Sequence, residues 1–457
     1  MDHHSSPTYL EKMRETHAAG NARSYGWRKN HLVKLRKALY AHEEAIYAAL
    51  YTDLGKNREE CWITEIGFTI AEINFALKHL RGWMKPQKVR TNLLNFPGQS
   101  YIASEPLGVV LIIGPWNYPL QLVLAPLVGA LAAGNVAVLK PSEEAPATAA
   151  VLQQLIDDTF DETVVKVVQG PGAEVIPAMM ENFRFDHIFY TGSTRVGKII
   201  YELAARTLTP VTLELGGKNP CIIESDADIE VAAKRLALIK FSNAGQMCVA
   251  PDYLLVHQRV KDRFVAALKA RIEEYYVKDD YHFGKVVNEK AFDRIVEYMK
   301  GGTIIYGGQC DRERLWVAPT LMEDVPAHAA MMKEEIFGPL LQLIAWQEEK
   351  EVYDIISRNP NPLALYVFTG SNVKAHKWTT SIPFGGGCIN NASFHLTNHH
   401  LPFGGRGASG TGAYHGKFSF DTFSHKKGIM RTPTWFDPSV RYPPFRGKLN
   451  LFKKLIK

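Results

Sequence analysis

The sequence predicts an α/β protein whose first sheet is parallel and covered by helices on both faces. Short apolar runs alternate with longer stretches of helical periodicity. Strands buried on both faces are continuously apolar, and strands that alternate with helices pair in parallel. The five apolar runs cover 108–114, 135–140, 164–168, 187–192 and 211–215, and they are separated by helical stretches such as 120–133, 147–160 and 196–205.

Polar or glycine-rich segments follow four of these runs. Ligands of open parallel sheets bind outside the carboxyl ends of the strands, so these segments predict a binding site. They read Pro-Trp-Asn-Tyr-Pro (115–119), Lys-Pro-Ser-Glu (140–143), Thr-Gly-Ser-Thr-Arg-Val-Gly (191–197) and Glu-Leu-Gly-Gly-Lys (214–218). The third segment is typical of phosphate binding near a helix N-terminus, although it lacks the full dinucleotide fingerprint.

A second α/β unit is predicted over about 219–391. Its apolar runs lie at 253–256, 303–306, 340–346 and 363–368. Cys248 belongs to this unit, whereas the polar loops belong to the first. We therefore expect the active site in the cleft between the two units.

The remaining segments flank these units. Residues 9–81 have helical periodicity and are expected to cover a sheet. Prolines and a glycine interrupt 86–105, which predicts an extended arm, and 418–429 is expected to form a strand that pairs with 99–105. The tail from residue 432 has three interpretations: a packed helix, a helix on a membrane surface or a disordered end. We favour the first and third over membrane contact.

Composition and charge exclude several classes of protein. The chain has 457 residues, of which 46% are apolar and 22% charged, and its net charge of +6 accompanies no nucleic-acid-binding motif. No stretch has the apolar length of a membrane span, and the first residues do not resemble a signal peptide. The cysteines show no CxxC spacing, which favours a reducing compartment and argues against disulfides and a cysteine zinc site; they are Cys61, Cys221, Cys248, Cys310 and Cys388. We predict a cytoplasmic protein that does not bind nucleic acid.

Cys248 is the candidate nucleophile. It lies in the segment Phe-Ser-Asn-Ala-Gly-Gln-Met-Cys-Val-Ala-Pro-Asp-Tyr (241–253), in which Gly245 and Gln246 precede it and Pro251 follows. A thiol displayed in this way attacks an electrophile once a nearby base or positive charge generates the thiolate. A lone cysteine is more often a buried structural residue, and only the other motifs decide against that alternative.

Taken together, the motifs resemble those of the aldehyde dehydrogenase superfamily. The resemblance covers roughly residues 9–444. Cys248 followed by Val-Ala-Pro-Asp-Tyr, and the later segments Gly-Ala-Tyr-His-Gly-Lys-Phe-Ser-Phe and Arg-Tyr-Pro-Pro, resemble its class 3 branch, which acts on fatty and aromatic aldehydes. The motifs that carry the resemblance are the four loop segments above with Gly-Gln-Met-Cys, Glu-Glu-Ile-Phe-Gly-Pro (334–339) and Leu-Pro-Phe-Gly-Gly (401–405).

The resemblance implies oxidation of an aldehyde to a carboxylic acid through a thiohemiacetal and a thioester on Cys248. Asn117 and a backbone N–H near Cys248 would stabilise the oxyanion, a contribution of roughly 3 kcal/mol per donor. Glu214 would act as the general base for the water that hydrolyses the thioester. From the residues alone, we favour for Asn117 the role of cap of a helix that starts near Pro119. Glu214 follows an apolar strand, where a carboxylate is costly unless it is used or paired.

The resemblance also implies a nicotinamide cofactor, NAD first and NADP as the alternative. Glu335 would hold the nicotinamide ribose, and Phe337 would pack near the nicotinamide. From the residues alone, Glu335 could instead be an ordinary surface charge and Phe337 a core aromatic. Lys140 and Glu143 would contact the adenosine ribose, where a carboxylate disfavours the 2′-phosphate of NADP. The other expected cofactor contacts are Trp116, Gly192, Ser193, Val196 and Gly197.

By the same resemblance the fold comprises a Rossmann-like NAD-binding domain, a second α/β catalytic domain and a small β oligomerisation arm. We expect residues 1–85 and 106–212 in the first domain and 213–392 in the second. The arm would comprise 86–105 and 417–431, followed by a tail over 432–457. Class 3 relatives join their sheets across a dimer interface, so a homodimer is expected.

Three histidines, His395, His399 and His400, could suggest a metal site. They lack acidic or cysteine companions at ligand spacing, so we expect a solvated loop or a substrate entrance and no metal. Two residues depart from the usual pattern of the superfamily. Met247 stands before the nucleophile where a threonine is common, which leaves the preferred chain length open, and Arg406 follows Gly405.

Two other functions compete with aldehyde oxidation. A CoA-acylating or esterolytic relative would release the thioester differently, and Glu214 argues against it because a general base favours hydrolysis. A catalytically inactive binding protein is the other alternative. The presence of all four expected residues, Cys248, Glu214, Asn117 and Glu335, argues against it.

Overall fold

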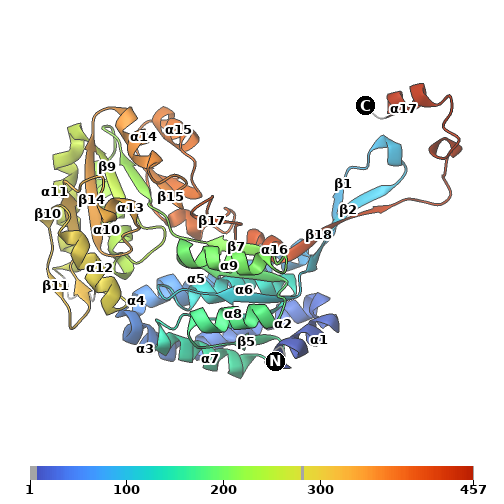
Figure 1. Ribbon diagram of the computed structural model, residues 1–457, viewed down its shortest axis with the longest axis horizontal. Helices are drawn as coiled ribbons and strands as arrows, with labels where there is room; N and C mark the ends of the chain where they lie inside the picture. Colours follow the sequence, from blue (N-terminus) through green and yellow to red (C-terminus); the bar gives the residue numbers. More distant parts are fainter. Residues whose placement is uncertain (1–7, 279–282, 456–457) are drawn as a thin grey trace.

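The structure is a computed structural model that describes residues 8–278 and 283–455. Residues 1–7 of the expected first domain, 279–282 of the second and 456–457 of the tail lie outside the described residues. Figure 1 shows two lobes of helices packed on sheets, with an arm that projects from one of them. Within the described ranges, no helix has the length and apolar character needed to cross a membrane.

The first lobe contains a six-stranded sheet in the order β17-β7-β6-β3-β4-β5. Five strands are parallel, and β17 pairs antiparallel with β7 at the edge. The five strands expected from the apolar runs are confirmed, whereas β17 is only two residues long and was not predicted. The strands are β3 (Val109–Ile113), β4 (Val136–Lys140), β5 (Val165–Val167), β6 (His187–Thr191), β7 (Val211–Glu214) and β17 (Gly410–Thr411).

Helices cover both faces of this sheet. Val110 and Ile112 of β3 belong to one hydrophobic cluster, with α2 (Tyr25–Ala41), α5 (Gly67–Trp83), α6 (Gln121–Ala133) and α7 (Pro146–Thr159). The alternate residues of β3 belong to another, with α1 (Thr8–Ala18), α8 (Gly172–Asn182) and α9 (Thr194–Ala205). Successive strand residues point to opposite faces, so a continuously apolar strand serves two cores. The helical segment also contains α3 (Glu43–Leu54), α4 (Arg58–Cys61) and a π-helical turn, η2 (Trp62–Ile66).

The second lobe contains a seven-stranded sheet in the order β10-β13-β14-β9-β8-β15-β16. All neighbours are parallel except β10, which is antiparallel to β13. Its strands are β8 (Pro220–Ile223), β9 (Tyr253–His257), β10 (Thr303–Tyr306), β13 (Thr320–Glu323), β14 (Leu340–Trp346), β15 (Ala364–Phe368) and β16 (Gly386–Ile389). Its main helices are α10 (Ile229–Phe241), α11 (Lys261–Tyr276), α12 (Glu289–Met299), α14 (Glu349–Ser357) and α15 (Asn372–Ser381).

The arm is a three-stranded antiparallel sheet, with β2 between β1 and β18. The strands are β1 (Gln87–Val89), β2 (Gln99–Pro106) and β18 (Ser424–Arg431). The register places Ser424 opposite Pro106 and Arg431 opposite Gln99. The expected pairing of 99–105 with a late strand is therefore confirmed.

The expected strand over 418–429 is wrong in its first half. Residues 417–422 form a helix, α16 (Lys417–Thr422), and the strand begins at Ser424. The alternation of Phe418 and Phe420 fits a strand, but the segment packs on α6. A β-carbon on Gly129 of α6 would lie only 2.5 Å from the β-carbon of Ser419. This close helix contact, which joins distant parts of the chain, decides the conformation.

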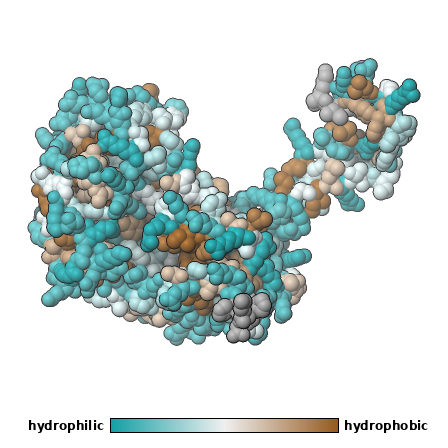
Figure 2. All heavy atoms as spheres, in the orientation of Figure 1, coloured by the Kyte–Doolittle hydropathy of each residue, from teal (hydrophilic) through white to brown (hydrophobic). Residues whose placement is uncertain are grey.

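The tail lies at the outer end of the arm, where it ends in a short helix, α17 (Leu449–Leu455) (Figure 1). The Arg441 guanidinium donates hydrogen bonds to the carbonyl groups of Leu94 and Phe96 in the β1–β2 connection. Large apolar side chains are exposed on the arm and tail, among them Leu93 (85%), Phe96 (65%) and Trp435 (78%). Figure 2 shows apolar residues along this projection.

Candidate active site

Residues of both lobes line a cavity of about 220 Å³. From the first lobe come the loop after β3, the β6–α9 turn and the end of β7. From the second come the segment before β9 and the segment between α13 (Ala330–Lys333) and β14. Eight of the twelve predicted site residues line this cavity: Trp116, Asn117, Gly192, Ser193, Glu214, Cys248, Glu335 and Phe337. Lys140, Glu143, Val196 and Gly197 are not among its lining residues.

A run of three left-handed residues delivers Cys248 to the cavity. The φ angle is 50° at Asn243, 52° at Ala244 and 73° at Gly245. Non-glycine residues in this region cost of order 1–3 kcal/mol each and persist where the surroundings fix them. Asn243 is fixed by hydrogen bonds from its backbone N–H to Glu60 Oε1 (2.7 Å) and from Nδ2 to the Asn117 carbonyl (2.9 Å).

The thiol of Cys248 is half-buried beside two carboxyl groups. Burial, and then the charges of Glu335 and Glu214, raise the pKa of Cys248 to about 12. In this state the thiol holds its proton near neutral pH, and only the deprotonated sulfur would be an effective nucleophile. The Cys248 carbonyl accepts a hydrogen bond from Asn219 Nδ2 at 2.7 Å, which fixes the backbone at Cys248.

Glu214 ends β7 and is 3% exposed. Within the part of the chain that the structure describes, neither carboxyl oxygen has a hydrogen-bond partner. Burial raises the pKa of this carboxyl well above its usual range. A buried, unpartnered carboxyl group at a cavity is costly for stability, and it has the raised proton affinity of a general base that works near neutral pH.

Asn117 does not cap a helix, so that alternative is wrong. Helix α6 begins at Gln121, and Glu65 Oε2 accepts the backbone N–H groups of Leu120 (3.2 Å) and Gln121 (2.8 Å) in place of Asn117. The Asn117 side chain instead donates one Nδ2 hydrogen to the Gln246 carbonyl at 3.0 Å. A primary amide has two N–H groups, so one remains for a ligand in the cavity.

Glu335 and Phe337 are both half-buried and line the cavity, unlike an ordinary surface charge and core aromatic. A β-carbon on Gly216 would lie 2.0 Å from Glu335 Oε2, so only glycine admits the carboxyl group at that position. Burial, and then the charge of Asp252, raise the pKa of Glu335 to about 8. The rings of Phe337 and Trp116 meet edge to face with centroids 5.3 Å apart.

The four predicted residues outside the cavity lining form two groups. Buried Lys140 donates hydrogen bonds to Glu143 Oε2 (3.0 Å) and to the Pro141 carbonyl (2.7 Å). Glu143 Oε1 also accepts the Gly172 N–H at 2.8 Å. Val196 and Gly197 lie in the first turn of α9, which Ser193 caps by accepting the Val196 N–H at 3.4 Å.

The expected solvated loop is found at only one of the three histidines, His400. His395 is 8% exposed, and its Nδ1 lies 3.6 Å from Cys388 Sγ. His399 instead lies 3.1 Å from Glu72, a carboxyl group that also contacts His415 at 3.4 Å. His400 is exposed. Across residues 8–278 and 283–455, no group of three or more His, Cys, Asp or Glu side chains is arranged to hold a metal ion.

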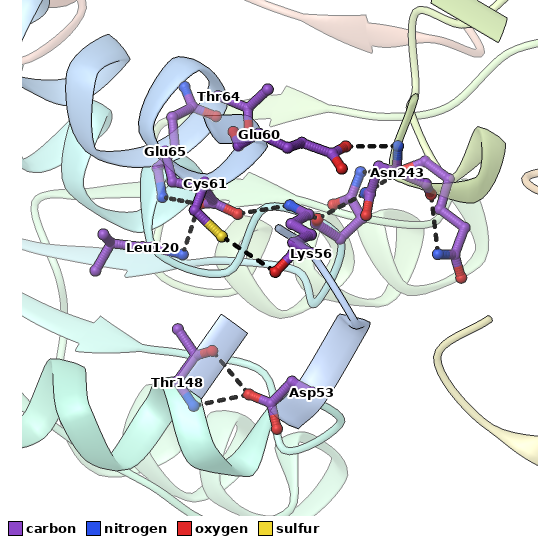
Figure 3. Close-up of polar contacts among 12 residues, drawn as sticks. Asp53, Lys56, Glu60, Cys61, Thr64, Glu65, Leu120, Thr148 and Asn243 are labelled. Atoms are coloured by element: carbon purple, nitrogen blue, oxygen red, sulfur yellow. Dashed lines mark hydrogen bonds and ion pairs between the residues drawn. The ribbon is translucent and has the colours of Figure 1, made fainter. Parts of the chain in front are cut away.

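A buried polar network behind the cavity was not predicted (Figure 3). Lys56 and Glu65 form an ion pair at 2.8 Å with both side chains fully buried. Glu60 lies on the same stretch and holds Asn243. Nothing in the sequence distinguishes these charges from those of a solvated helix face, because their partners come from distant segments.

The comparisons with known proteins agree with this architecture. The sequence model of the aldehyde dehydrogenase family matches residues 8–429. The 4,4'-diaponeurosporen-aldehyde dehydrogenase of Staphylococcus aureus is 45% identical over 94% of this chain and 95% of its own. Aldehyde dehydrogenase family 3 member H1 of Arabidopsis thaliana is 43% identical over 98% of this chain and 94% of its own.

A solved structure described as the substrate-bound state of Staphylococcus aureus AldH has a TM-score of 0.96. It is 43% identical and covers 98% of this chain and 99% of its own. The family match and these relatives, together with the two-lobed α/β fold, define an oxidoreductase. The chain belongs to the aldehyde dehydrogenase family, and its family 3 relatives confirm the class 3 resemblance. As a member it acts on aldehydes and uses NAD or NADP.

Proposed function

We propose that this enzyme oxidises medium- or long-chain aliphatic or aromatic aldehydes to carboxylic acids, with Cys248 as nucleophile, Glu214 as general base and Asn117 as oxyanion donor. NAD is the favoured cofactor and NADP the alternative. The observation that carries the proposal is the placement of a thiol, an unpartnered buried carboxyl group and an amide donor around one cavity.

The first step forms a bond between Cys248 and the aldehyde carbon. The thiol proton passes to water, and the sulfur then attacks the carbonyl carbon. The carbonyl π electrons move to oxygen, where the free N–H of Asn117 stabilises the negative charge. Removing one such donor typically costs roughly 10²- to 10³-fold in kcat. The Gln246 carbonyl holds the amide in place for this step.

The second half of the reaction releases the acid. The cofactor, when bound, supplies the hydride acceptor that turns the thiohemiacetal carbon into an acyl thioester. Glu214 then takes a proton from water, the hydroxide attacks the acyl carbon, and the Cys248 thiolate leaves and is reprotonated. The sum is aldehyde, oxidised cofactor and water giving acid, reduced cofactor and a proton.

The residues present fit a nicotinamide cofactor. Thr191 Oγ1 and Asn117 Oδ1 are buried at the cavity without a hydrogen-bond partner among the described residues. Gly216 leaves room for Glu335, the proposed ligand of the nicotinamide ribose. Trp116 and Phe337 would flank the nicotinamide side, and the capped N-terminus of α9, with Gly192, Ser193, Val196 and Gly197, suits a pyrophosphate.

Glu143 supports NAD over NADP. Its carboxylate is fixed by the Gly172 N–H and by Lys140, while its side chain remains 46% exposed. Hydrogen bonds from Gly172 and Lys140 and the Lys140 charge outweigh burial and lower the pKa of this carboxyl, so it is negative near neutral pH. We propose that Lys140 and Glu143 contact the adenosine ribose, where this charge repels a 2′-phosphate.

The apolar lining supports an apolar substrate. Pro115, Leu122 and Leu215 line the cavity beside Trp116 and Phe337. Met247, next to the nucleophile, packs on the hydrophobic core, and its sulfur lies 3.5 Å from Ser393 Oγ. The Staphylococcus aureus relative is named for a diaponeurosporen-aldehyde, which supports a long apolar aldehyde here.

We further propose the division into domains at 1–85 with 106–212 and 213–392, a homodimer joined through the arm, and a cytoplasmic location. The exposed apolar side chains of the arm and tail support an interface between two copies. The free cysteines support a reducing compartment. Light scattering that showed a monomer would remove the dimer proposal.

The test of the function is formation of reduced nicotinamide, followed by absorbance, with hexanal and with benzaldehyde. Each aldehyde is combined with NAD and then with NADP, and the Cys248→Ser variant is the control. Turnover by the wild type alone supports the proposal and ranks the cofactors. Turnover that requires CoA would favour the acylating relative, and no turnover under any condition would favour an inactive binding protein.

A further inference from the structure

We propose that Lys56 is a positioning residue for Asn117, and thus acts on the oxyanion donor from behind the active site. The inference rests on the proposed function. Lys56 follows α3 and precedes α4, far from the catalytic motifs in sequence, and does not line the cavity. Its ammonium group reaches the loop that carries Asn117.

The contacts of Lys56 are few and all are buried. Its side chain is 1% exposed, and Nζ donates to Glu65 Oε1 at 2.8 Å and to the Asn117 backbone carbonyl at 2.9 Å. Nζ also lies 4.0 Å from the centre of the Tyr118 ring. A buried ammonium group is costly unless it is paired and hydrogen-bonded. Here the ion pair stabilises the charge, and a second N–H of the ammonium group donates to the Asn117 carbonyl.

The Asn117 carbonyl has a second hydrogen-bond donor, which lies in the loop over 243–248 that ends at Cys248. Asn243 Nδ2 donates to the Asn117 carbonyl at 2.9 Å and to the Gln246 carbonyl at 3.2 Å. The Gln246 carbonyl accepts Asn117 Nδ2 as well, at 3.0 Å. Hydrogen bonds to the Asn117 and Gln246 carbonyls therefore link the loop that carries Asn117 to the loop that carries Cys248. Lys56 is the other donor to the Asn117 carbonyl.

Glu65 fixes the same loop at its other end. While Oε1 accepts Lys56, Oε2 accepts the backbone N–H groups of Leu120 and Gln121 at the start of α6. The segment from Asn117 to Gln121 is thus held at both ends by one ion pair. Figure 3 shows Lys56, Glu65, Leu120 and Asn243 in this arrangement.

Replacing Lys56 by methionine removes the donor and keeps an unbranched side chain. Without it the loop loses one of the two donors to the Asn117 carbonyl, and a misplacement of about 1 Å at a catalytic group can cost on the order of 10²-fold in rate. We expect kcat of Lys56→Met to fall at least tenfold, while KM for the cofactor changes less than about threefold. Lys56→Arg restores part of the loss.

A double-mutant cycle separates positioning from general destabilisation. If Lys56 acts through Asn117, then Lys56→Met lowers kcat much less in an Asn117→Ala background than in the wild type. A merely structural role would lower kcat by the same factor in both backgrounds, and that result would overturn the proposal. A folded Lys56→Met variant with kcat within about twofold of the wild type would overturn it as well.

Arg28 supplies a matched control. It is another buried cation, 4% exposed, and donates to the carbonyls of Ala22 and Ala132 at 2.9 and 3.1 Å, away from the cavity lining. Arg28→Met is expected to lower stability without lowering kcat. If Lys56→Met does not fold, Glu65→Gln removes the negative partner and keeps a side chain of the same size. Glu65→Gln must then show the same coupling to Asn117→Ala.

The failure of the proposed function is distinguishable from the failure of this inference. A wild type that is inactive towards every aldehyde refutes the proposed function. An active wild type with an unaffected Lys56→Met variant refutes only the positioning role of Lys56. A crystal structure of the variant gives a readout independent of activity. The Asn117 amide is expected to leave hydrogen-bonding distance of the Gln246 carbonyl, and an unchanged amide would contradict positioning.

Discussion

The backbone of Gly245 lies so close to Gly338 that a β-carbon on Gly245 would stand 2.2 Å from the Gly338 carbonyl oxygen. Gly245 also has φ of 73°, a conformation that strains any other residue. These two constraints act on the turn that precedes Cys248. The turn before Cys248 therefore depends on glycine for both its space and its backbone angle.

Gly245→Ala is expected to lower the free energy of unfolding by roughly 2 kcal/mol or more and to reduce turnover. Chemical denaturation measures the first effect. The control is Gly82→Ala, because a β-carbon there would meet no atom within 4 Å and the residue lies in helix α5. That variant should be as stable as the wild type or slightly more so, and equal losses in both variants would contradict the argument.

The reactivity of Cys248 should rise steeply with pH. Burial and the charges of Glu335 and Glu214 raise its pKa to about 12, so the thiolate fraction increases about tenfold per pH unit around neutrality. The rate of iodoacetamide labelling at Cys248, followed by peptide mass in the cofactor-free enzyme, should increase accordingly. A plateau below about pH 9 would show a much lower pKa.

Glu335→Gln should increase this labelling rate at about pH 9, because it removes a negative charge that disfavours the thiolate. The effect should be smaller below about pH 8, since the pKa of Glu335 is itself raised to about 8 and the carboxyl group is then neutral. Equal labelling of both proteins at high pH would contradict the charge interaction.

Glu214→Gln should stop the reaction after the thioester has formed. We expect a rapid release of about one reduced cofactor per active site, followed by turnover slowed by roughly 10²- to 10⁴-fold. Rapid mixing with absorbance detection measures both phases. Without a burst, Glu214 would be required before hydride transfer, for the thiol proton.

Glu224→Gln is the matched control for Glu214→Gln. Glu224 is also buried (2% exposed), but it pairs with Lys374 and accepts the Trp378 indole N–H outside the cavity lining. Its replacement should destabilise the protein and leave the steady-state rate per folded site unchanged.

Glu72 should stabilise the fold in a pH-dependent manner. Burial alone would raise its pKa, but His399 and His415 outweigh burial and lower the pKa to about 2. A depressed carboxyl pKa contributes stability above the unfolded value of about 4.5, and the contribution disappears as pH falls from there towards about 2. Glu72→Gln should therefore lower the free energy of unfolding at pH values above about 4.5.

Denaturation curves of wild type and Glu72→Gln at several pH values test this. Their difference should narrow as the pH falls below about 4.5. Glu59, an exposed carboxylate, provides the comparison, and Glu59→Gln should stay within about 0.5 kcal/mol of the wild type. A Glu72 difference that did not change with pH would mean that lost packing, and not charge, explains it.

Much of the fold follows from local patterns. The apolar runs at 108–114 and 187–192 predicted β3 and β6 because a strand buried on both faces must be apolar throughout. For residues 417–422 the same reasoning wrongly predicted a strand, because Phe418 and Phe420 alternate with polar residues as in a strand. The contact of Ser419 with Gly129, between segments far apart in the chain, determines the helix there.

The candidate site also contains residues that the sequence predicted and residues that it did not. Cys248, Glu214 and Asn117 were predicted because each stands in a recognisable motif, and the structure places all three at one cavity. Lys56 and Glu65 were not predicted because their contacts depend on burial and on partners in other segments. A lysine and a glutamate in a helical region are ordinary surface residues in most sequences.

The antiparallel pairing of β2 with β18 has a consequence for the time order of folding. Residues 107–423, which include the whole second lobe, separate β2 from β18. During synthesis the ribosome releases β2 long before its partner exists, so β2 waits with only the short β1 beside it. The arm is therefore completed only after the intervening residues have been synthesised, and an assembly that depends on the arm cannot begin before that point.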